Sequence, residues 1–310
     1  MNMETAENMT MTTSQIEGII LKGIGGFYYV RTKDGLIECK PRGVMRKKRV
    51  TPYVGDRVTL EISEGQMPQI VTVHERKNSL IRPPVANIDM LVMVCSICDP
   101  YPSTKILDRL IAVAEYKKIE PVIVITKTDL DREKADEFAN IYRSAGFTTI
   151  TVSPDSDEEI TTLKSLMAGK VCAFSGNSGV GKSTLLNRIS PKLSIPTGET
   201  SKKLGRGRHT TRHVELYELD NGALVADTPG FSSVEIVQFD IILKDEMENC
   251  FREFEPYLGQ CKFTGCSHTK EKGCAVLAAL NEGKIAKSRH ESYLMMYDEA
   301  KQIKEWELDK

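Results

Sequence analysis

The chain has 310 residues, 40% hydrophobic and 27% charged, which excludes a fibrous or largely disordered protein and leaves room for several domains. Its 42 basic and 43 acidic residues give a formal net charge of -1, so any nucleic-acid-binding surface must be a local patch. No apolar run reaches the roughly 18 residues of a membrane span, and the start lacks a signal-peptide pattern, so we expect a cytoplasmic protein without a membrane partner.

The N-terminal part of the chain begins with a polar segment, residues 1–14, which we interpret as a flexible tail. Residues 15–76 follow with short runs of β-forming side chains, separated by turn residues such as those at 33–35. Several short strands in so small a segment predict a β-barrel of the OB type, an architecture that commonly binds RNA. The expected strands are 19–21, 27–31, 36–40, 57–62 and 70–74.

A basic loop joins the third and fourth of these strands. A charge run of this kind is often only a solvated loop, but its position on a predicted barrel favours an RNA-binding surface. Its basic residues are Arg42, Arg46, Lys47, Lys48 and Arg49.

The central part of the chain, residues 77–240, starts with a proline-containing linker and then alternates apolar strands with amphipathic helices. Repeated βαβ crossovers predict a parallel, doubly wound α/β sheet. We expect strands at 88–96, 121–126, 148–152, 171–175 and 223–226, and helices after Ser103, at 132–145, at 159–168 and after residue 183.

A phosphate-binding motif, GNSGVGKS, lies between a predicted buried strand and a predicted helix. Backbone N–H groups of such a loop can surround phosphates, Lys182 can reach the β- and γ-phosphates, and Ser183 can ligate magnesium. This motif is the P-loop of nucleotide-binding proteins. We predict that GTP contacts Gly176, Asn177, Ser178, Gly179, Val180, Gly181, Lys182, Ser183 and Thr184.

The sequence TKTD at 126–129 resembles the guanine-reading N-K-x-D motif of GTPases. Asp129 can accept hydrogen bonds from two guanine donors that adenine lacks, which predicts guanine preference. Thr126 replaces the usual asparagine and thereby loses an amide contact. Ser153 follows another predicted strand and belongs to a weaker motif that backs the guanine ring. The predicted base-binding residues are Thr126, Lys127, Asp129 and Ser153.

Two further segments are typical of GTPase switches. The sequence DTPG at 227–230 resembles the motif in which Asp227 holds magnesium through water and the Gly230 N–H meets the γ-phosphate. The segment 205–213 lies where the first switch is expected; a threonine there ligates magnesium, and Thr211 is favoured over Thr210. The predicted catalytic residues are Lys182, Thr211 and Gly230, and the predicted magnesium ligands are Ser183, Thr211 and Asp227.

The first-switch segment is also strongly basic, so it can equally contact RNA phosphates. Phe231 stands where many GTPases place the glutamine that orients water, so intrinsic hydrolysis is expected to be slow. His209 or His213 could orient water instead, although a structural or RNA-contacting histidine is the commoner case.

The order of the motifs is unusual, because the guanine motif precedes the P-loop, whereas ordinary GTPases have the reverse order. The same sheet with its ends re-joined would explain this order, so we predict a circularly permuted GTPase domain. The second switch then leads directly into the C-terminal segment.

The C-terminal part, residues 241–310, is expected to be mostly helical and to end in one long charged helix at 286–307. Three cysteines and a histidine crowd together there, which predicts one structural zinc site that is closed to substrate. A second pair, Cys95 and Cys98, lies in or beside a buried strand, where core packing is favoured over a redox pair. The predicted zinc ligands are Cys261, Cys266, His268 and Cys274.

Together, the barrel, the permuted motif order and the terminal Cys-Cys-His-Cys cluster resemble the ribosome small subunit-dependent GTPase A (RsgA) family over residues 16–310. The resemblance implies a bacterial assembly factor that binds the small (30S) ribosomal subunit and its 16S rRNA late in maturation. It also implies that hydrolysis of GTP to GDP and phosphate, stimulated by the subunit, releases the factor. We expect a monomer.

Two other function classes remain open. A nucleoside kinase or ATPase would share the P-loop but would leave Asp129 and the motif at 227–230 unexplained. A non-enzymatic RNA-binding module built from the barrel and the zinc unit would keep its RNA binding after loss of Lys182 and would show no turnover. The alternative to the ribosomal function is a P-loop, nucleotide-dependent RNA-binding protein that does not act on the ribosome.

Overall fold

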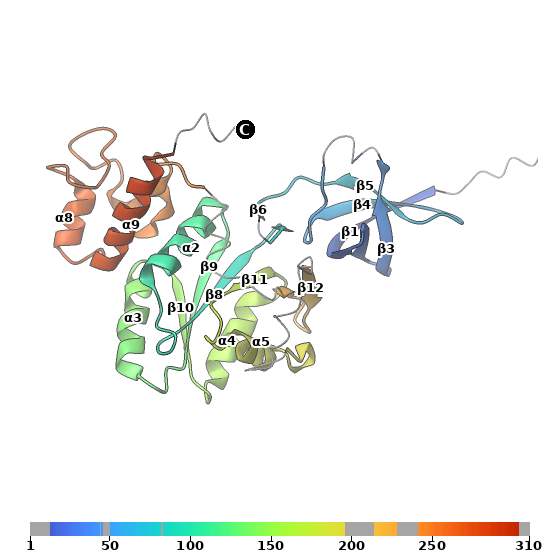
Figure 1. The fold of residues 1–310 in the computed structure, drawn as a ribbon, viewed down its shortest axis with the longest axis horizontal. Helices are drawn as coiled ribbons and strands as arrows, with labels where there is room; N and C mark the ends of the chain where they lie inside the picture. The colour runs from blue at the N-terminus through green and yellow to red at the C-terminus, as the bar shows by residue number, and fades with distance from the viewer. Residues whose placement is uncertain are drawn as a thin grey trace, which may run out of the picture.

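The computed structural model describes residues 13–43, 45, 50–81, 83–195, 214–227 (without the side chain of 227) and 241–303. It confirms the predicted architecture of a barrel, a central α/β domain and a C-terminal helical module. The barrel and the C-terminal module lie on opposite sides of the central domain (Figure 1). Within these described ranges no helix has the length and apolar character needed to cross a membrane.

Five strands form the N-terminal barrel, and β4 pairs with β1 to close it. The bent strand β1 pairs with β4 through its first half and with β2 through its second. At the bend, a Cβ on Gly18 would lie 2.5 Å from the Arg31 carbonyl oxygen, so only glycine fits. The strands are β1 (Thr13–Ile24), β2 (Phe27–Thr32), β3 (Gly35–Pro41), β4 (Arg57–Ser63) and β5 (Gln69–Val73).

The proline-containing linker forms an ordered joint between the barrel and the central domain. Its strands β6 (Ser79–Leu80) and β7 (Val85–Ala86) pair with each other. The buried Asn87 donates a hydrogen bond from Nδ2 to the carbonyl of Gly55 in the barrel at 3.0 Å. Gly55 packs so closely that a Cβ would lie 2.2 Å from the Ala86 carbonyl oxygen. The barrel is therefore firmly attached next to the start of the central sheet.

The central sheet has the order β10-β9-β8-β11-β13-β12, and all of its pairs are parallel except β12–β13. The antiparallel edge strand β12 was not predicted, because it is short and only Leu216 within it is buried. The strands are β8 (Met90–Ser96), β9 (Glu120–Thr126), β10 (Thr148–Val152), β11 (Val171–Ser175), β12 (Glu215–Glu218) and β13 (Leu224–Asp227).

Helices cover both faces of this sheet, as the predicted doubly wound fold requires. Apolar residues of α2 and α3 join one core cluster, and those of α4 and α5 join a second. Each helix thus buries one apolar stripe against the sheet. The helices are α2 (Thr104–Tyr116), α3 (Arg132–Ser144), α4 (Asp157–Met167), α5 (Lys182–Ile189) and the short η1 (Pro191–Leu193).

The C-terminal module packs on the face of the sheet that α2 and α3 cover, and its apolar residues belong to the same core cluster. The predicted long terminal helix is shorter than expected, since α9 ends at Ala300 rather than near residue 307. Residues 304–310 lie outside the described part of the chain. The elements are η2 (Met247–Cys250), η3 (Arg252–Tyr257), α8 (Ala275–Asn281) and α9 (Lys287–Ala300).

Candidate functional site

The predicted nucleotide-binding motifs lie at the edge of the sheet where the parallel strands have their carboxyl ends. The P-loop follows β11, the guanine motif follows β9, Ser153 follows β10, and Asp227 ends β13. Ligands of open α/β sheets bind at this edge. Because the order in space is β10-β9-β8-β11-β13, the base-reading motifs lie on one side of the P-loop and Asp227 on the other.

Glycines shape the backbone of the predicted P-loop at three positions. A Cβ on Gly176 would lie 2.5 Å from the Val94 carbonyl oxygen, so the loop starts in close contact with β8. Gly179 and Gly181 have φ angles of 85° and 87°, a left-handed region that favours glycine. Lys182 begins α5, and its Nζ lies 3.5 Å from the Gly176 carbonyl oxygen. The ammonium group is therefore held over the loop.

The guanine motif is tied directly to the P-loop. The buried Thr126 donates its hydroxyl hydrogen to the Val180 carbonyl oxygen at 2.5 Å, and the Cys95 carbonyl oxygen lies 3.1 Å from the same hydroxyl. Lys127 donates from Nζ to the Asp99 carbonyl oxygen at 2.5 Å. The threonine that replaces the usual asparagine thus connects β9 to the phosphate-binding loop.

Two contacts in this region were missed by sequence reasoning. Arg188 of α5 donates to the Ser153 carbonyl oxygen at 2.7 Å and to Asp157 at 3.0 Å, which ties the P-loop helix to the predicted base-backing loop. The carbonyl of Asp99 holds Lys127, as described above. The sequence signal that could have indicated the contacts of Arg188 is the position of this residue on the helix that follows the P-loop. A backbone carbonyl such as that of Asp99 leaves no signal in the sequence.

Apart from the backbone of Asp227, the predicted switch residues lie outside the described residues. The same holds for most of the two basic loops, at 46–49 and 202–212. At the base-reading side, Asp129 is exposed to solvent at the sheet edge. The predicted residues outside the described part are His209, Thr210, Thr211, His213, Gly230, Phe231 and the side chain of Asp227.

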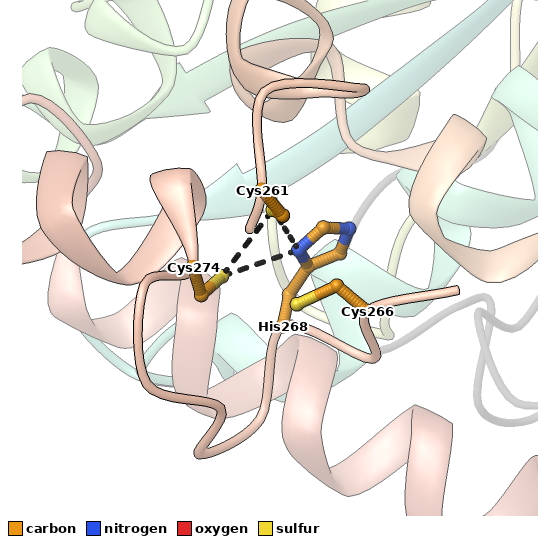
Figure 2. A group of neighbouring side chains, drawn as sticks. All are labelled: Cys261, Cys266, His268 and Cys274. Atoms are coloured by element: carbon orange, nitrogen blue, oxygen red, sulfur yellow. Dashed lines mark hydrogen bonds between the residues drawn. The ribbon is translucent and has the colours of Figure 1, made fainter. Parts of the chain in front are cut away.

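The four predicted zinc ligands converge in the C-terminal module (Figure 2). Their ligand atoms all lie within 4.8 Å of one another. The Sγ atoms of Cys261 and Cys274 are 3.8 Å apart, and His268 Nδ1 lies 3.6 Å from the first and 3.3 Å from the second. Cys266 completes the group, and three of the four residues are buried.

The distances among Cys261, His268 and Cys274 fit a tetrahedral metal centre. Bond lengths of about 2.3 Å to sulfur and about 2.0–2.1 Å to nitrogen separate two sulfurs by about 3.8 Å and a sulfur from a nitrogen by about 3.6 Å. Backbone N–H groups of Ala275 and Leu277 donate to the sulfurs of Cys261 and Cys274 at 3.3 Å and 3.4 Å. Donors of this kind favour the thiolate form that a metal needs.

Glu248 was missed by sequence reasoning. Its Oε2 lies 2.8 Å from His268 Nε2, while Nδ1 of the same ring faces the cysteines. A carboxylate behind a ligating histidine fixes the tautomer and the orientation of the ring. Glu248 lies far from His268 in the sequence, in η2, so only the packing of the module reveals the pair.

The loop that carries two of the ligands is held by the carboxylate of Glu271. This carboxylate accepts the N–H groups of Ser267 at 3.0 Å and Thr269 at 2.9 Å, as well as the Ser267 hydroxyl. Burial favours a higher pKa for Glu271, but the hydrogen bonds from Ser267 and the backbone outweigh it and lower the pKa to about 2. Its stabilising effect is therefore lost only as the pH falls from the ordinary carboxyl range toward 2.

The second cysteine pair shows no metal-site geometry. Cys95 is part of β8, and burial raises its pKa to about 12, so its thiol is not ionised near neutral pH. This agrees with the prediction that Cys95 and Cys98 serve core packing.

Comparison with known protein families identifies two domains. The RsgA GTPase family model matches residues 73–237, and the RsgA N-terminal domain model matches residues 17–70. Two solved structures have the same fold. A crystal structure of YjeQ from Thermotoga maritima matches with a TM-score of 0.80 and 35% identity, covering 94% of this chain and 100% of that one. YloQ, described as a circularly permuted GTPase, matches with a TM-score of 0.77 and 35% identity, covering 97% and 99%.

Curated relatives agree with these matches. A protein of Caldanaerobacter subterraneus is 44% identical over 289 residues, which cover 93% of this chain and 97% of the relative. A protein of Bacillus cereus is 41% identical over 292 residues, covering 93% and 98%. Both are named small ribosomal subunit biogenesis GTPase RsgA. Because the matches span both chains almost completely and include the permuted nucleotide domain, this chain belongs to the RsgA GTPase family and hydrolyses GTP.

Proposed function

We propose that this GTPase binds the small ribosomal subunit, acts in its late maturation and leaves it when GTP is hydrolysed. The observation that carries the proposal is the match to relatives named for small-subunit biogenesis over nearly the whole of both chains. A shared nucleotide domain alone would leave the target open. Here the match extends through the barrel and the C-terminal module. A nucleotide-dependent RNA-binding protein without a ribosomal role is therefore not favoured.

The P-loop residues are proposed to bind the phosphates of GTP. Lys182 would neutralise the β- and γ-phosphates, and its position over the loop supports this role. Ser183 would ligate magnesium together with Thr211 of the first switch and, through water, Asp227 of the second. The Gly230 N–H would meet the γ-phosphate. We place this GTPase domain at residues 77–240, between the barrel at 15–76 and the zinc-binding module at 241–310.

Guanine is proposed to bind beside β9, where Asp129 is exposed at the sheet edge. Its carboxylate can pair with two donors of the guanine ring, which adenine does not offer. Thr126 and Lys127 are held against the P-loop and the Asp99 carbonyl, so the base-reading and phosphate-binding segments form one frame. Ser153 closes the other side of the base.

The metal of the C-terminal module is proposed to be zinc, bound once per chain by Cys261, Cys266, His268 and Cys274. Three thiolates and one imidazole are typical ligands of structural zinc, which stabilises the fold around it. We further propose that the chain acts as a monomer in the cytoplasm and that its RNA target is 16S rRNA. The basic loops of the barrel and of the first switch supply the charge for that contact.

The decisive measurement is GTP turnover with and without purified small ribosomal subunits. Because Phe231 cannot orient water as a glutamine does, we expect slow turnover of the free chain and stimulation of at least roughly 10-fold by the subunit. Binding to the subunit should be tighter with a non-hydrolysable GTP analogue than with GDP, and both effects should weaken with salt. Unchanged turnover across a titration of subunits at low salt would reject the ribosomal function.

A further inference from the structure

The barrel contacts the GTPase domain at a second place besides the linker joint. Strand β1 pairs with the sheet edge β12 through one residue pair, Lys22 and Glu215. The Nζ of Lys22 lies 2.7 Å from Oε2 of Glu215, and Arg31 of β2 forms an ion pair with Glu218 of β12. Figure 1 shows β12 on the side of the domain that faces the barrel. We call these four residues the barrel clasp.

The barrel clasp is directly connected to the ends of both predicted switch segments. Strand β12 begins at Glu215, two residues after the segment at 205–213, and β13 ends at Asp227. Glu215 pairs with Lys22 on one side and with Asp227 on the other. Lys22 of β1, Glu215 of β12 and Asp227 of β13 therefore form one row of paired backbone positions across three neighbouring strands. This row joins the barrel to the strand that follows the predicted first switch and to the start of the predicted second switch.

The barrel clasp is weaker than the other contacts between domains. Its four side chains are between 29% and 46% exposed, and partly exposed ion pairs contribute little to stability. The linker joint, in contrast, contains the buried Asn87, and the C-terminal module is fixed by the buried Arg289. The clasp is therefore expected to contribute less to holding the barrel than the linker joint does.

We propose that the barrel clasp couples the nucleotide state to the barrel, so that RNA on the barrel and GTP in the P-loop favour the same closed arrangement. The row from Lys22 through Glu215 to Asp227 gives the switch ends and the barrel a common backbone connection. Since coupling between two binding sites is reciprocal, RNA on the barrel would stabilise the GTP-bound arrangement as much as GTP strengthens RNA binding. The part of this proposal that concerns RNA rests on the proposed ribosomal function, whereas the coupling between the nucleotide and the barrel does not.

Charge exchange within the clasp tests this coupling. Lys22→Glu and Glu215→Lys each break the pair, and the double variant restores it with the charges reversed. We expect each single variant to lower the subunit-stimulated turnover by about 2- to 5-fold, and the double variant to recover most of it. GDP affinity should stay within about 2-fold of the unmodified chain, because the proposed clasp favours the GTP-bound arrangement and not the GDP-bound one. The pair Arg31→Glu and Glu218→Arg provides an independent second test.

A matched control separates coupling from direct RNA contact. Lys33→Glu makes the same charge change on an exposed barrel residue outside the clasp. If Lys22 acted only by attracting RNA, Lys33→Glu would lower the subunit-stimulated turnover about as much as Lys22→Glu does. Glu215→Lys would then leave the stimulated turnover unchanged, and the double variant would not regain the turnover lost by Lys22→Glu. That combination of results would overturn the proposal.

A second measurement needs no ribosomal subunit. Amide hydrogen exchange at residues 18–24 and 214–218 should be slower with a non-hydrolysable GTP analogue than with GDP. Glu215→Lys should abolish this difference, and the double variant should restore it. Equal exchange in both nucleotide states of the unmodified chain would overturn the clasp proposal. If the exchange difference is observed but small subunits do not stimulate turnover, the clasp proposal stands and the ribosomal function is rejected.

Discussion

At the scale of single residues, Thr126 shows how a replaced side chain takes a new partner. The guanine motif lacks the usual asparagine, and the structure places the threonine hydroxyl on the Val180 carbonyl oxygen of the P-loop. Thr126 and Val180 are both buried, so the Val180 carbonyl oxygen has little access to solvent near this contact. The hydroxyl therefore stabilises the P-loop from the side on which the base is predicted to bind.

Thr126→Val is expected to weaken GDP binding by about 5-fold, since it removes one hydrogen bond of roughly 1 kcal/mol and leaves a carbonyl unpaired. Thr126→Ser keeps the hydroxyl and serves as the control, with an affinity close to that of the unmodified chain. Titration with a fluorescent GDP derivative measures both. Equal affinities for the valine and serine variants would show that the contact does not position the loop.

Asp129→Asn should change the base that the chain prefers. An amide cannot accept both guanine donors, but it can pair with the arrangement that xanthine presents. We expect XTP to compete better than GTP for the variant and GTP to compete better for the unmodified chain. Equal inhibition of the unmodified chain by ATP and GTP would contradict the assignment of Asp129.

At the scale of elements, the short helix η2 supports the candidate metal site through the side chain of Glu248. Glu248 holds His268 Nε2 at 2.8 Å, so its carboxylate fixes the ring that faces the cysteines. Glu248→Ala is expected to lower zinc affinity by about 10- to 100-fold, the usual effect of losing such a partner. Competition with a colorimetric chelator measures the affinity. The control is Glu246→Ala, at an exposed position in the same segment; if it lowered affinity equally, a specific role for Glu248 would be excluded.

Elements with a strong local pattern could be predicted closely. Strands β10 and β11 were predicted with their observed bounds, because the β-branched residues of β10 and the apolar run of β11 both end at turn residues. The edge strand β12 was missed, since its four residues show no comparable run. The terminal helix was predicted too long because charged residues continue past Ala300 without a glycine or proline to mark the end.

The residues of the candidate site divide in the same way, into those that a local sequence pattern predicts and those that only tertiary packing reveals. The P-loop and the Cys/His cluster could be predicted because their chemistry requires fixed residue types at short spacing. Arg188 and Glu248 could not, since each acts on a residue that is distant in the sequence and is brought close only by tertiary packing. The clasp between Lys22 and Glu215 belongs to this second group.

At the scale of the whole molecule, a buried ion cluster joins the C-terminal module to the GTPase domain. Arg289 of α9 donates to Glu253 at 2.7 Å and to Asp108 of α2 at 2.8 Å. Burial disfavours the charged guanidinium, but Glu253 and Asp108 outweigh it and raise the pKa of Arg289. Burial also raises the pKa of Asp108, and Arg289 offsets only part of that effect.

Replacing different members of this cluster is expected to lower the free energy of unfolding by different amounts. Arg289→Met leaves two buried carboxylates without their cation, so we expect the free energy of unfolding to fall by about 3–5 kcal/mol. Asp108→Asn should cost clearly less, because Glu253 still pairs with Arg289 and because burial already favours a neutral group at position 108. Lys287→Met, at an 86% exposed position of the same helix, should cost at most about 0.5 kcal/mol. Urea unfolding followed by circular dichroism measures all three. If Arg289→Met cost no more than Lys287→Met, the buried cluster could not be what fixes the C-terminal module to α2.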